Sequence, residues 1–205
     1  MKKKRQKNKI NWILNIIGII LILFFIFRFI ALIKGETIIH FFWLCNHIPL
    51  IAGIAILARN RFWLTAEISF LFFGFFTWVT DYIAIMFFGV HVSGATTYLF
   101  PITDKFFFGV TSVVHFLSIP LMISALYIMK NPAKKAWLGA LIHAIILVPI
   151  IIYFGREYNL DCFLHPCINW IPNFALYPPI IFLGYFLIFV IPINYALVKL
   201  IKNKK

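Results

Sequence analysis

Six long apolar stretches, separated by short connections, dominate this sequence. Each is close to the ~20 residues that a helix needs to cross about 30 Å of hydrocarbon. A helix suits that environment because it pairs its own backbone polar groups. The pattern predicts an all-α polytopic membrane protein, a bundle of six transmembrane helices forming one integral membrane domain over residues 1–205. The predicted spans are 10–33, 38–57, 62–80, 106–129, 136–154 and 173–198.

Basic residues fall on alternate connections. Fifteen of the 19 Lys and Arg residues lie at 2–9, 59–61, 130–135 and 199–205. By the positive-inside rule, this arrangement predicts cytoplasmic N- and C-termini, with residues 1–9 as a basic cytoplasmic tail. The longer connections, 81–105 and 155–172, then face outside, where long loops often cover a site.

The composition narrows the class of protein. The net charge is +13, but hydrophobic residues make up 63% and the mean hydropathy is +0.96, too apolar for a soluble nucleic-acid binder. A basic excess at membrane edges instead fits contact with anionic lipid headgroups, so membrane lipids are the expected partners. The predicted localisation is the cell membrane. No phosphate-binding loop or G-x-S-x-G motif occurs, and we expect no cofactor.

Polar side chains within the spans gather at similar depths. At ~1.5 Å per helical residue, Cys45 lies ~10 Å and His115 ~14 Å below the outer edge. Arg28 lies at ~8 Å, Thr77 at ~5 Å, and Asp81 at the boundary. A thiol beside an imidazole is a minimal nucleophile and base. Alternatively, the cysteine is a small buried hydrophobe, and the histidine only joins helices by hydrogen bonds.

Two further ionisable residues fall outside this layer. His143 lies ~16 Å from the outer edge, and we interpret it as a second polar contact. Glu67 lies nearer the cytoplasmic side, and its position predicts an inner-interface residue close to Arg59 and Arg61.

The last outer connection contains Cys162 and Cys167, with His165 between them. Facing an oxidising compartment, the two cysteines favour a local disulfide. A metal bound by all three side chains is the weaker alternative, because the usual two-residue spacing between cysteines is missing.

Several segments together resemble the YwaF-like integral membrane protein family in order and spacing over residues 35–170. They are Phe41–Leu50, Arg59–Arg61, Thr80-Asp81, Tyr98–Phe108, His115, Tyr158–Leu160 and His165-Pro166. The family's more distant relatives include an animal membrane acyltransferase and the androgen-induced hydrolases of fatty acid esters of hydroxy fatty acids.

The resemblance implies a six-helix bundle with a nucleophile on one helix and a histidine on another, matching Cys45 and His115. In the hydrolase relatives a threonine replaces the nucleophile. The sequence departs from the family pattern at Trp43, where a histidine is usual, and at adjacent Thr80 and Asp81, which a proline usually separates.

The predicted function is a membrane-embedded lipid acyl hydrolase or acyltransferase of the outer leaflet, with Cys45 as nucleophile and His115 as base. The alternative is a non-catalytic small transporter or membrane accessory protein, in which Arg28, Asp81 and His115 form a polar ladder. The predicted substrate-binding residues are Arg28, Asn46, Thr77, Asp81 and Thr111. Three of them, Asn46, Thr77 and Thr111, are also candidates for the donor that stabilises the oxyanion.

Overall fold

A computed structural model of the chain describes residues 2–35, 38–101, 103–154, 164 and 176–202. Within these ranges all regular structure is helical, which confirms the predicted all-α class for this part of the chain. Element η1 is a 3₁₀-helix and η3 a π-helix. The order is α1 (Lys2–Lys34), η1 (Ile38–Phe42), α2 (Leu44–Leu57), α3 (Arg61–Phe88), α4 (Lys105–Met129), α5 (Trp137–Phe154), α6 (Tyr177–Gly184), η3 (Tyr185–Val190) and α7 (Ile191–Lys202).

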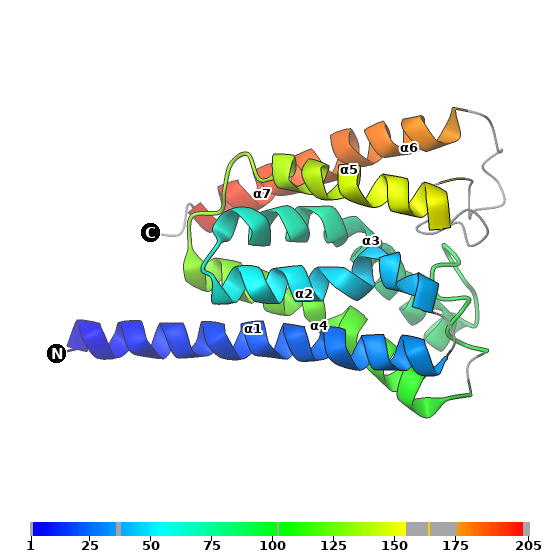
Figure 1. Cartoon of the computed structure of the whole chain (residues 1–205), viewed down its shortest axis with the longest axis horizontal. Helices are drawn as coiled ribbons and strands as arrows, with labels where there is room; N and C mark the ends of the chain where they lie inside the picture. The colour runs from blue at the N-terminus through cyan, green and yellow to red at the C-terminus, as the bar shows by residue number, and fades with distance from the viewer. Residues whose placement is uncertain (1, 36–37, 102, 155–163, 165–175, 203–205) are drawn as a thin grey trace.

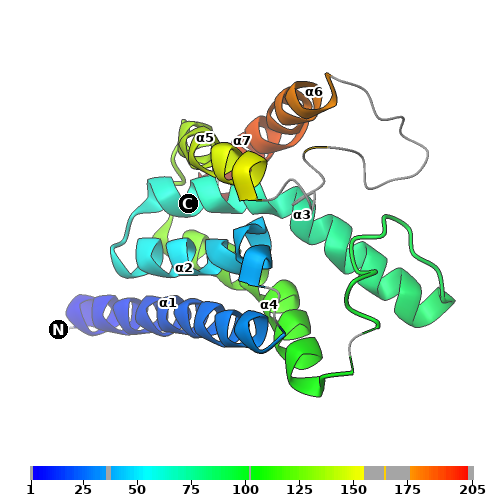
Figure 2. The ribbon, with the colours of Figure 1, turned by 45° about the vertical axis from the view of Figure 1, so that its right-hand side comes forward.

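The helices run back and forth, and the two termini lie at the same end of the molecule (Figure 1). We call this the terminal end and the opposite one the loop end. Helix α3 is central, because it contacts α2, α4, α5 and α7. Helices α1 and α2 lie on one side of it, and α5 with α6 and α7 on the other (Figures 1 and 2).

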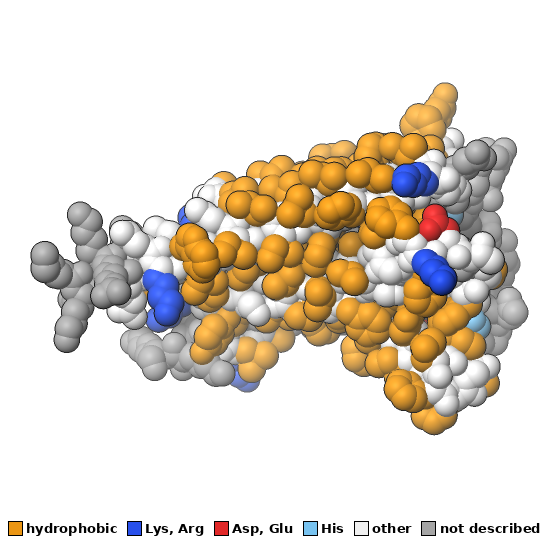
Figure 3. Space-filling model, turned by 90° about the horizontal axis from the view of Figure 1, so that it is seen from below, with side chains coloured by type: hydrophobic (Ala, Val, Ile, Leu, Met, Phe, Trp, Pro, Cys, Tyr) orange, Lys and Arg blue, Asp and Glu red, His pale blue; other side chains and the backbone are white. Residues whose placement is uncertain are grey.

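Five helical segments of the described chain are long and apolar enough to cross a membrane. A space-filling view shows a broad hydrophobic band with Lys and Arg toward its ends (Figure 3). By length and composition, this is an integral, multi-pass membrane protein. The segments are Asn8–Lys34, Arg61–Phe88, Lys105–Met129, Trp137–Phe154 and Tyr177–Ile201.

The predicted second span, 38–57, is not one helix. Trp43 has an extended backbone (φ −62°, ψ 136°) and separates η1 from α2, which has only 14 residues. Pro49 has no N–H to give to the Cys45 carbonyl, and its ring crowds that carbonyl, which weakens any helix on the N-terminal side. As a result, Cys45 lies in the first turn of α2.

The third span is longer than predicted. It continues to Phe88, where Gly89 ends it in the left-handed conformation (φ 70°), and does not stop at Thr80. Asp81 is therefore inside the helix and not at its end. The sixth span continues to Lys202 instead of Val198, and its predicted start at 173 lies outside the described residues.

Helices α1 and α2 approach closely at two glycines. A Cβ on Gly53 would lie 2.8 Å from both the Gly18 carbonyl oxygen and Ile22 Cγ1. On Gly18, it would lie 3.1 Å from the Gly53 carbonyl oxygen. Small residues let helix backbones meet in membranes, where packing and not water drives association.

We expect Gly53→Ala to destabilise the protein by about 1–3 kcal/mol, because the added methyl group must push two backbones apart. The matched control is Gly74→Ala in α3, where a Cβ would meet nothing within 4 Å. Thermal unfolding in detergent measures the stability of both variants. Equal melting temperatures for the two variants would contradict the close α1–α2 packing.

Candidate active site

Cys45 and His115 line the same small cavity within the helical bundle. The cavity measures about 10 Å³, close to the smallest that holds one water molecule. Three apolar side chains and one hydroxyl complete it. Its full lining is Cys45, Leu71, Phe75, Val114, His115 and Ser118.

The hydrogen bonds of His115 define its tautomer. Its Nδ1 lies 2.8 Å from the Thr111 carbonyl oxygen, which only accepts, so Nδ1 carries the proton. Nε2 then carries the lone pair. It is buried and has no hydrogen-bond partner among the described residues. The ring stacks on Trp78, with centroids 4.1 Å apart. A fixed imidazole with an available Nε2 is suited to accept a proton.

Arg28 is a fully buried cation beside this cavity. Its Nε donates to Asn46 Oδ1 at 2.8 Å and its Nη1 to Thr111 Oγ1 at 2.6 Å. The guanidinium also lies 4.5 Å from the centre of the Phe107 ring. Its Nη2 has no hydrogen-bond partner, and no carboxylate pairs with Arg28, in the part of the chain that the structure describes. The positive charge is thus held by neutral groups.

Two positive fields act on the Cys45 sulfur. Arg28 interacts with it electrostatically, and the first turn of α2 presents the positive end of the helix dipole. Both stabilise a negatively charged thiolate, the reactive form of cysteine. The Cys45 thiol donates to Asn46 Oδ1 in a long, weak contact of 3.8 Å, which favours the thiol over the thiolate only slightly. Cys45 forms no disulfide within the described residues.

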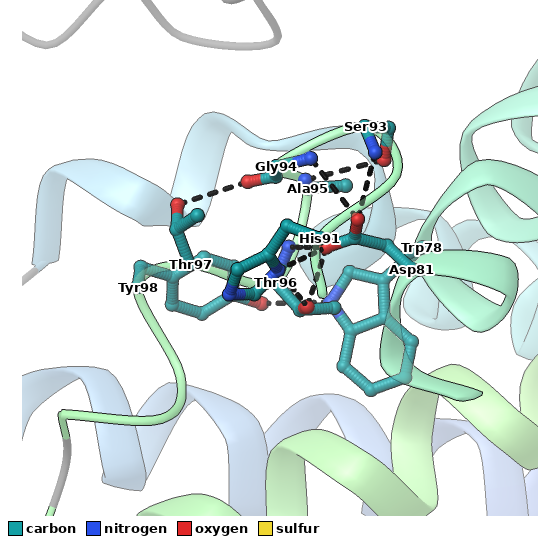
Figure 4. Close-up of polar contacts among 9 residues, drawn as sticks. All are labelled: Trp78, Asp81, His91, Ser93, Gly94, Ala95, Thr96, Thr97 and Tyr98. Carbon is teal, nitrogen blue, oxygen red and sulfur yellow. Dashed lines mark hydrogen bonds and ion pairs between the residues drawn. The ribbon is translucent and has the colours of Figure 1, made fainter. Parts of the chain in front are cut away.

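Asp81 anchors the loop between α3 and α4 (Figure 4). Its Oδ1 accepts the Ser93 and Gly94 amides at 2.8 and 3.0 Å. Its Oδ2 accepts the Thr96 amide at 2.9 Å, the Thr96 hydroxyl at 2.6 Å and His91 Nδ1 at 2.9 Å. Five donors occupy the lone pairs of one carboxylate. Asp81 therefore holds the loop, and its predicted contact with substrate stays a prediction.

The anchored loop reaches the histidine through aromatic rings. Tyr98 accepts a 3.1 Å hydrogen bond from Trp78 Nε1 (Figure 4), and Trp78 in turn stacks on His115. Burial raises the pKa of the Tyr98 phenol, so this side chain stays neutral. Sequence reasoning found Asp81 and His115 but not the two aromatic residues between them.

The predicted substrate contacts separate into two groups. Arg28, Asn46 and Thr111 are joined by hydrogen bonds, and Asn46 Nδ2 also donates to the His40 carbonyl at 2.5 Å. The Thr77 hydroxyl bonds to the Phe73 carbonyl of its own helix at 2.9 Å and does not line the cavity. The structure thus brings three of the predicted residues together and leaves Thr77 apart.

A second polar cluster connects Glu67, His143 and His47. Glu67 bonds to His143, and among the described residues it forms no ion pair with Arg59 or Arg61, so its predicted closeness to these arginines stays a prediction. The Arg59 guanidinium bonds instead to the Ile56 carbonyl at 2.6 Å and to α1. We call these three side chains, Glu67, His143 and His47, the buried relay. A depth comparison could have paired two of them, since Glu67 and His143 each lie six residues from the terminal-end start of their helices.

The predicted Cys162–Cys167 disulfide and the alternative metal site with His165 lie outside the described residues. In the described ranges, no group of three or more His, Cys, Asp or Glu side chains is arranged to hold a metal ion.

Comparisons with protein-family models, curated proteins and solved structures give no match to this chain. The resemblance to the YwaF-like family therefore stays a prediction.

Proposed function

We propose that this protein is a membrane-embedded lipid acyl hydrolase or acyltransferase, with Cys45 as the nucleophile and His115 as the general base. The observation that supports the proposal is that Cys45 and His115 both line one small cavity, and that His115 Nε2 is buried without a hydrogen-bond partner among the described residues. Arg28 and the α2 N-terminus add stabilisation for the thiolate.

The chemical steps follow from the tautomer of His115. Nε2 takes the proton of the Cys45 thiol as sulfur attacks the carbonyl carbon of an ester. The ester C–O bond then breaks, the leaving oxygen takes the proton from Nε2, and a thioester remains on Cys45. Water or a second lipid hydroxyl gives its proton to Nε2 and attacks the thioester. The C–S bond breaks, and the sulfur takes that proton back.

A lipid is the substrate class that we propose, and because the cavity of about 10 Å³ holds no more than one water molecule, an ester enters only when the helices around it separate. The cavity is lined by Leu71, Phe75 and Val114 and lies between membrane helices, where acyl chains are the surrounding medium. The buried Arg28 would stabilise the developing oxyanion or a charged headgroup. Asn46 and Thr111 stay the oxyanion-donor candidates, whereas Thr77 lies apart from the cavity. We further propose six passes, cytoplasmic termini and a site in the outer leaflet of the cell membrane.

A non-catalytic transporter is the second candidate function. It is supported by Glu67, a carboxylate that is fully buried within a predicted membrane span and paired with His143. Such intramembrane ionisable pairs mark ion and substrate pathways in transporters.

Acyl-enzyme trapping tests the enzymatic proposal. The full chain is reconstituted with phospholipid that carries an alkyne-labelled acyl chain, and hydroxylamine-sensitive label on the protein is measured. We expect label on the wild type and none on Cys45→Ala. We expect labelling to be slowed at least ~100-fold in His115→Asn, because general base catalysis is worth about 10²–10⁴ in rate.

The matched control is Ser112→Ala on α4, whose hydroxyl bonds only to the Phe108 carbonyl in the described structure. It should label like the wild type. Absence of label on the wild type, or label that persists in Cys45→Ala, would refute the proposal.

A further inference from the structure

The buried relay is a continuous chain of hydrogen bonds through three helices. His143 Nδ1, on α5, lies 2.9 and 3.1 Å from the two carboxylate oxygens of Glu67 on α3. His143 Nε2 lies 3.0 Å from Nε2 of His47 on α2. His47 Nδ1 ends the chain 3.1 Å from the Phe41 carbonyl oxygen of η1. The three side chains are all buried.

The contacts of the buried relay determine how many hydrogens it holds. The Phe41 carbonyl only accepts, so His47 Nδ1 must carry a hydrogen. One more hydrogen is needed between the two Nε2 atoms, and one between His143 and Glu67. Two neutral imidazoles bring only two hydrogens. The third belongs either to a protonated Glu67 or to an imidazolium beside an ionised Glu67.

The two forms carry the same net charge of zero and differ only in where protons lie. To convert the first into the second, Glu67 gives its proton to His143 Nδ1, and His143 Nε2 gives its proton to His47 Nε2. Glu67 is then a carboxylate and His47 an imidazolium. Each transfer runs along a hydrogen bond that already exists.

We propose that the buried relay is a proton-binding site of the membrane interior, which gains or loses one proton as a unit and moves it between Glu67 and His47. The fully bonded state holds three hydrogens, so loss of one leaves an excess negative charge. With Glu67 ionised and His143 Nδ1 keeping its hydrogen, His47 has one hydrogen for two contacts, so either the Nε2–Nε2 contact or the contact of His47 Nδ1 with the Phe41 carbonyl is left with two acceptors and breaks. In the second case, protonation is coupled to the packing of η1 on α2.

The three side chains of the buried relay lie at different depths in the bundle. Glu67 and His143 lie about 9 Å along their helices from the terminal end, and His47 about 15 Å from the terminal end of α2. The relay thus carries a proton from the terminal-end half of the bundle toward η1 at the loop end. Chains of carboxylates and histidines at such depths serve as proton relays in pumps and transporters.

Other titratable groups lie on the elements that surround the relay. Helix α1 presents Arg28, which bonds to Asn46, and η1 presents His40, which stacks on Trp43 with centroids 4.2 Å apart. Cys45 precedes the relay on α2. From η3, the Tyr185 hydroxyl bonds to the Phe70 carbonyl.

No Lys or Arg side chain of the described ranges forms a hydrogen bond or ion pair with the relay. Its charge is therefore balanced within the three side chains themselves.

Nuclear magnetic resonance of the full chain in lipid nanodiscs tests this proposal. With ¹⁵N-labelled histidine, the protonation of each ring nitrogen is followed against pH, together with the through-hydrogen-bond coupling between the two Nε2 nuclei. We expect the coupling to be present, and His47 and His143 to change protonation in one shared transition. Glu67→Gln should keep the coupling and lose the transition, because the amide imitates only the protonated carboxyl.

Asp104→Asn is the matched control, since it removes a carboxylate outside the relay while an asparagine can still cap α4. It should retain the shared transition. The proposal is overturned if the two histidines of the wild type titrate separately, if neither changes at any pH at which the protein stays folded, or if a metal ion is found bound between the two Nε2 atoms.

Discussion

Asp81→Ala is expected to lower the free energy of unfolding by about 3 kcal/mol, which is more than the loss expected for Asp104→Ala. The substitution removes one buried carboxylate and leaves five donors without their acceptor: three backbone amides, the Thr96 hydroxyl and His91. Hydrogen bonds to a charged group are worth about 1.5–3 kcal/mol each, and an unpaired buried donor costs about 1–3 kcal/mol, but freed loop groups regain water.

Asp104→Ala is the comparison for this loss. Asp104 caps α4 through the amides of Phe106 and Phe107 at 2.8 and 3.3 Å and is exposed. Its loss should cost about 1 kcal/mol, as for other N-caps. Thermal unfolding ranks the two variants by stability. Hydrogen exchange shows where the structure is weakened, because the Ser93, Gly94 and Thr96 amides should exchange faster in Asp81→Ala alone. A smaller effect of Asp81→Ala than of Asp104→Ala would contradict its role as the anchor of the loop.

The helices could be predicted from the sequence because apolar length is a strong and local property. Their ends could not always be predicted, for two different reasons. At Trp43 the helix breaks because Pro49 weakens the turn before it, an effect that hydropathy does not measure. At Thr80 the prediction ended too early, since Asp81 suggested water, whereas the loop itself supplies the polar partners inside the protein.

For the residues of the candidate site, only the depth along the helices could be predicted from the sequence. Counting residues places Cys45 and His115 at similar depths, and the structure adds that both line one cavity. Rotation about each helix axis decides which side chains face each other, and rotation depends on packing. For that reason Thr77 does not line the cavity, and the hydrogen bond of Glu67 to a histidine on another helix was not predicted.

Arg28→Met is expected to slow alkylation of Cys45 by at least tenfold while leaving the melting temperature unchanged or higher. The charge of Arg28 favours the thiolate, and a tenfold slowing corresponds to only about 1.4 kcal/mol of lost stabilisation. The same charge lowers the stability of the folded state, because it is fully buried without a carboxylate partner in the described chain. Replacing such a buried charge by an apolar side chain of similar size is often neutral or stabilising.

The two readouts separate a positioning role from a purely structural one. Thr111 Oγ1 keeps its hydrogen bond to the Phe107 carbonyl, and Asn46 Nδ2 keeps its bond to the His40 carbonyl. Asn46 Oδ1 loses the Arg28 donor and keeps the 3.8 Å contact with the Cys45 thiol. Alkylation by a long-chain maleimide measures the thiolate, and thermal unfolding measures the fold. Arg28→Lys should recover part of the rate, since it restores charge without the planar geometry. If Arg28→Met instead reacts at the wild-type rate but unfolds at a lower temperature, Arg28 serves packing, and Cys45 depends on the α2 N-terminus and His115 alone.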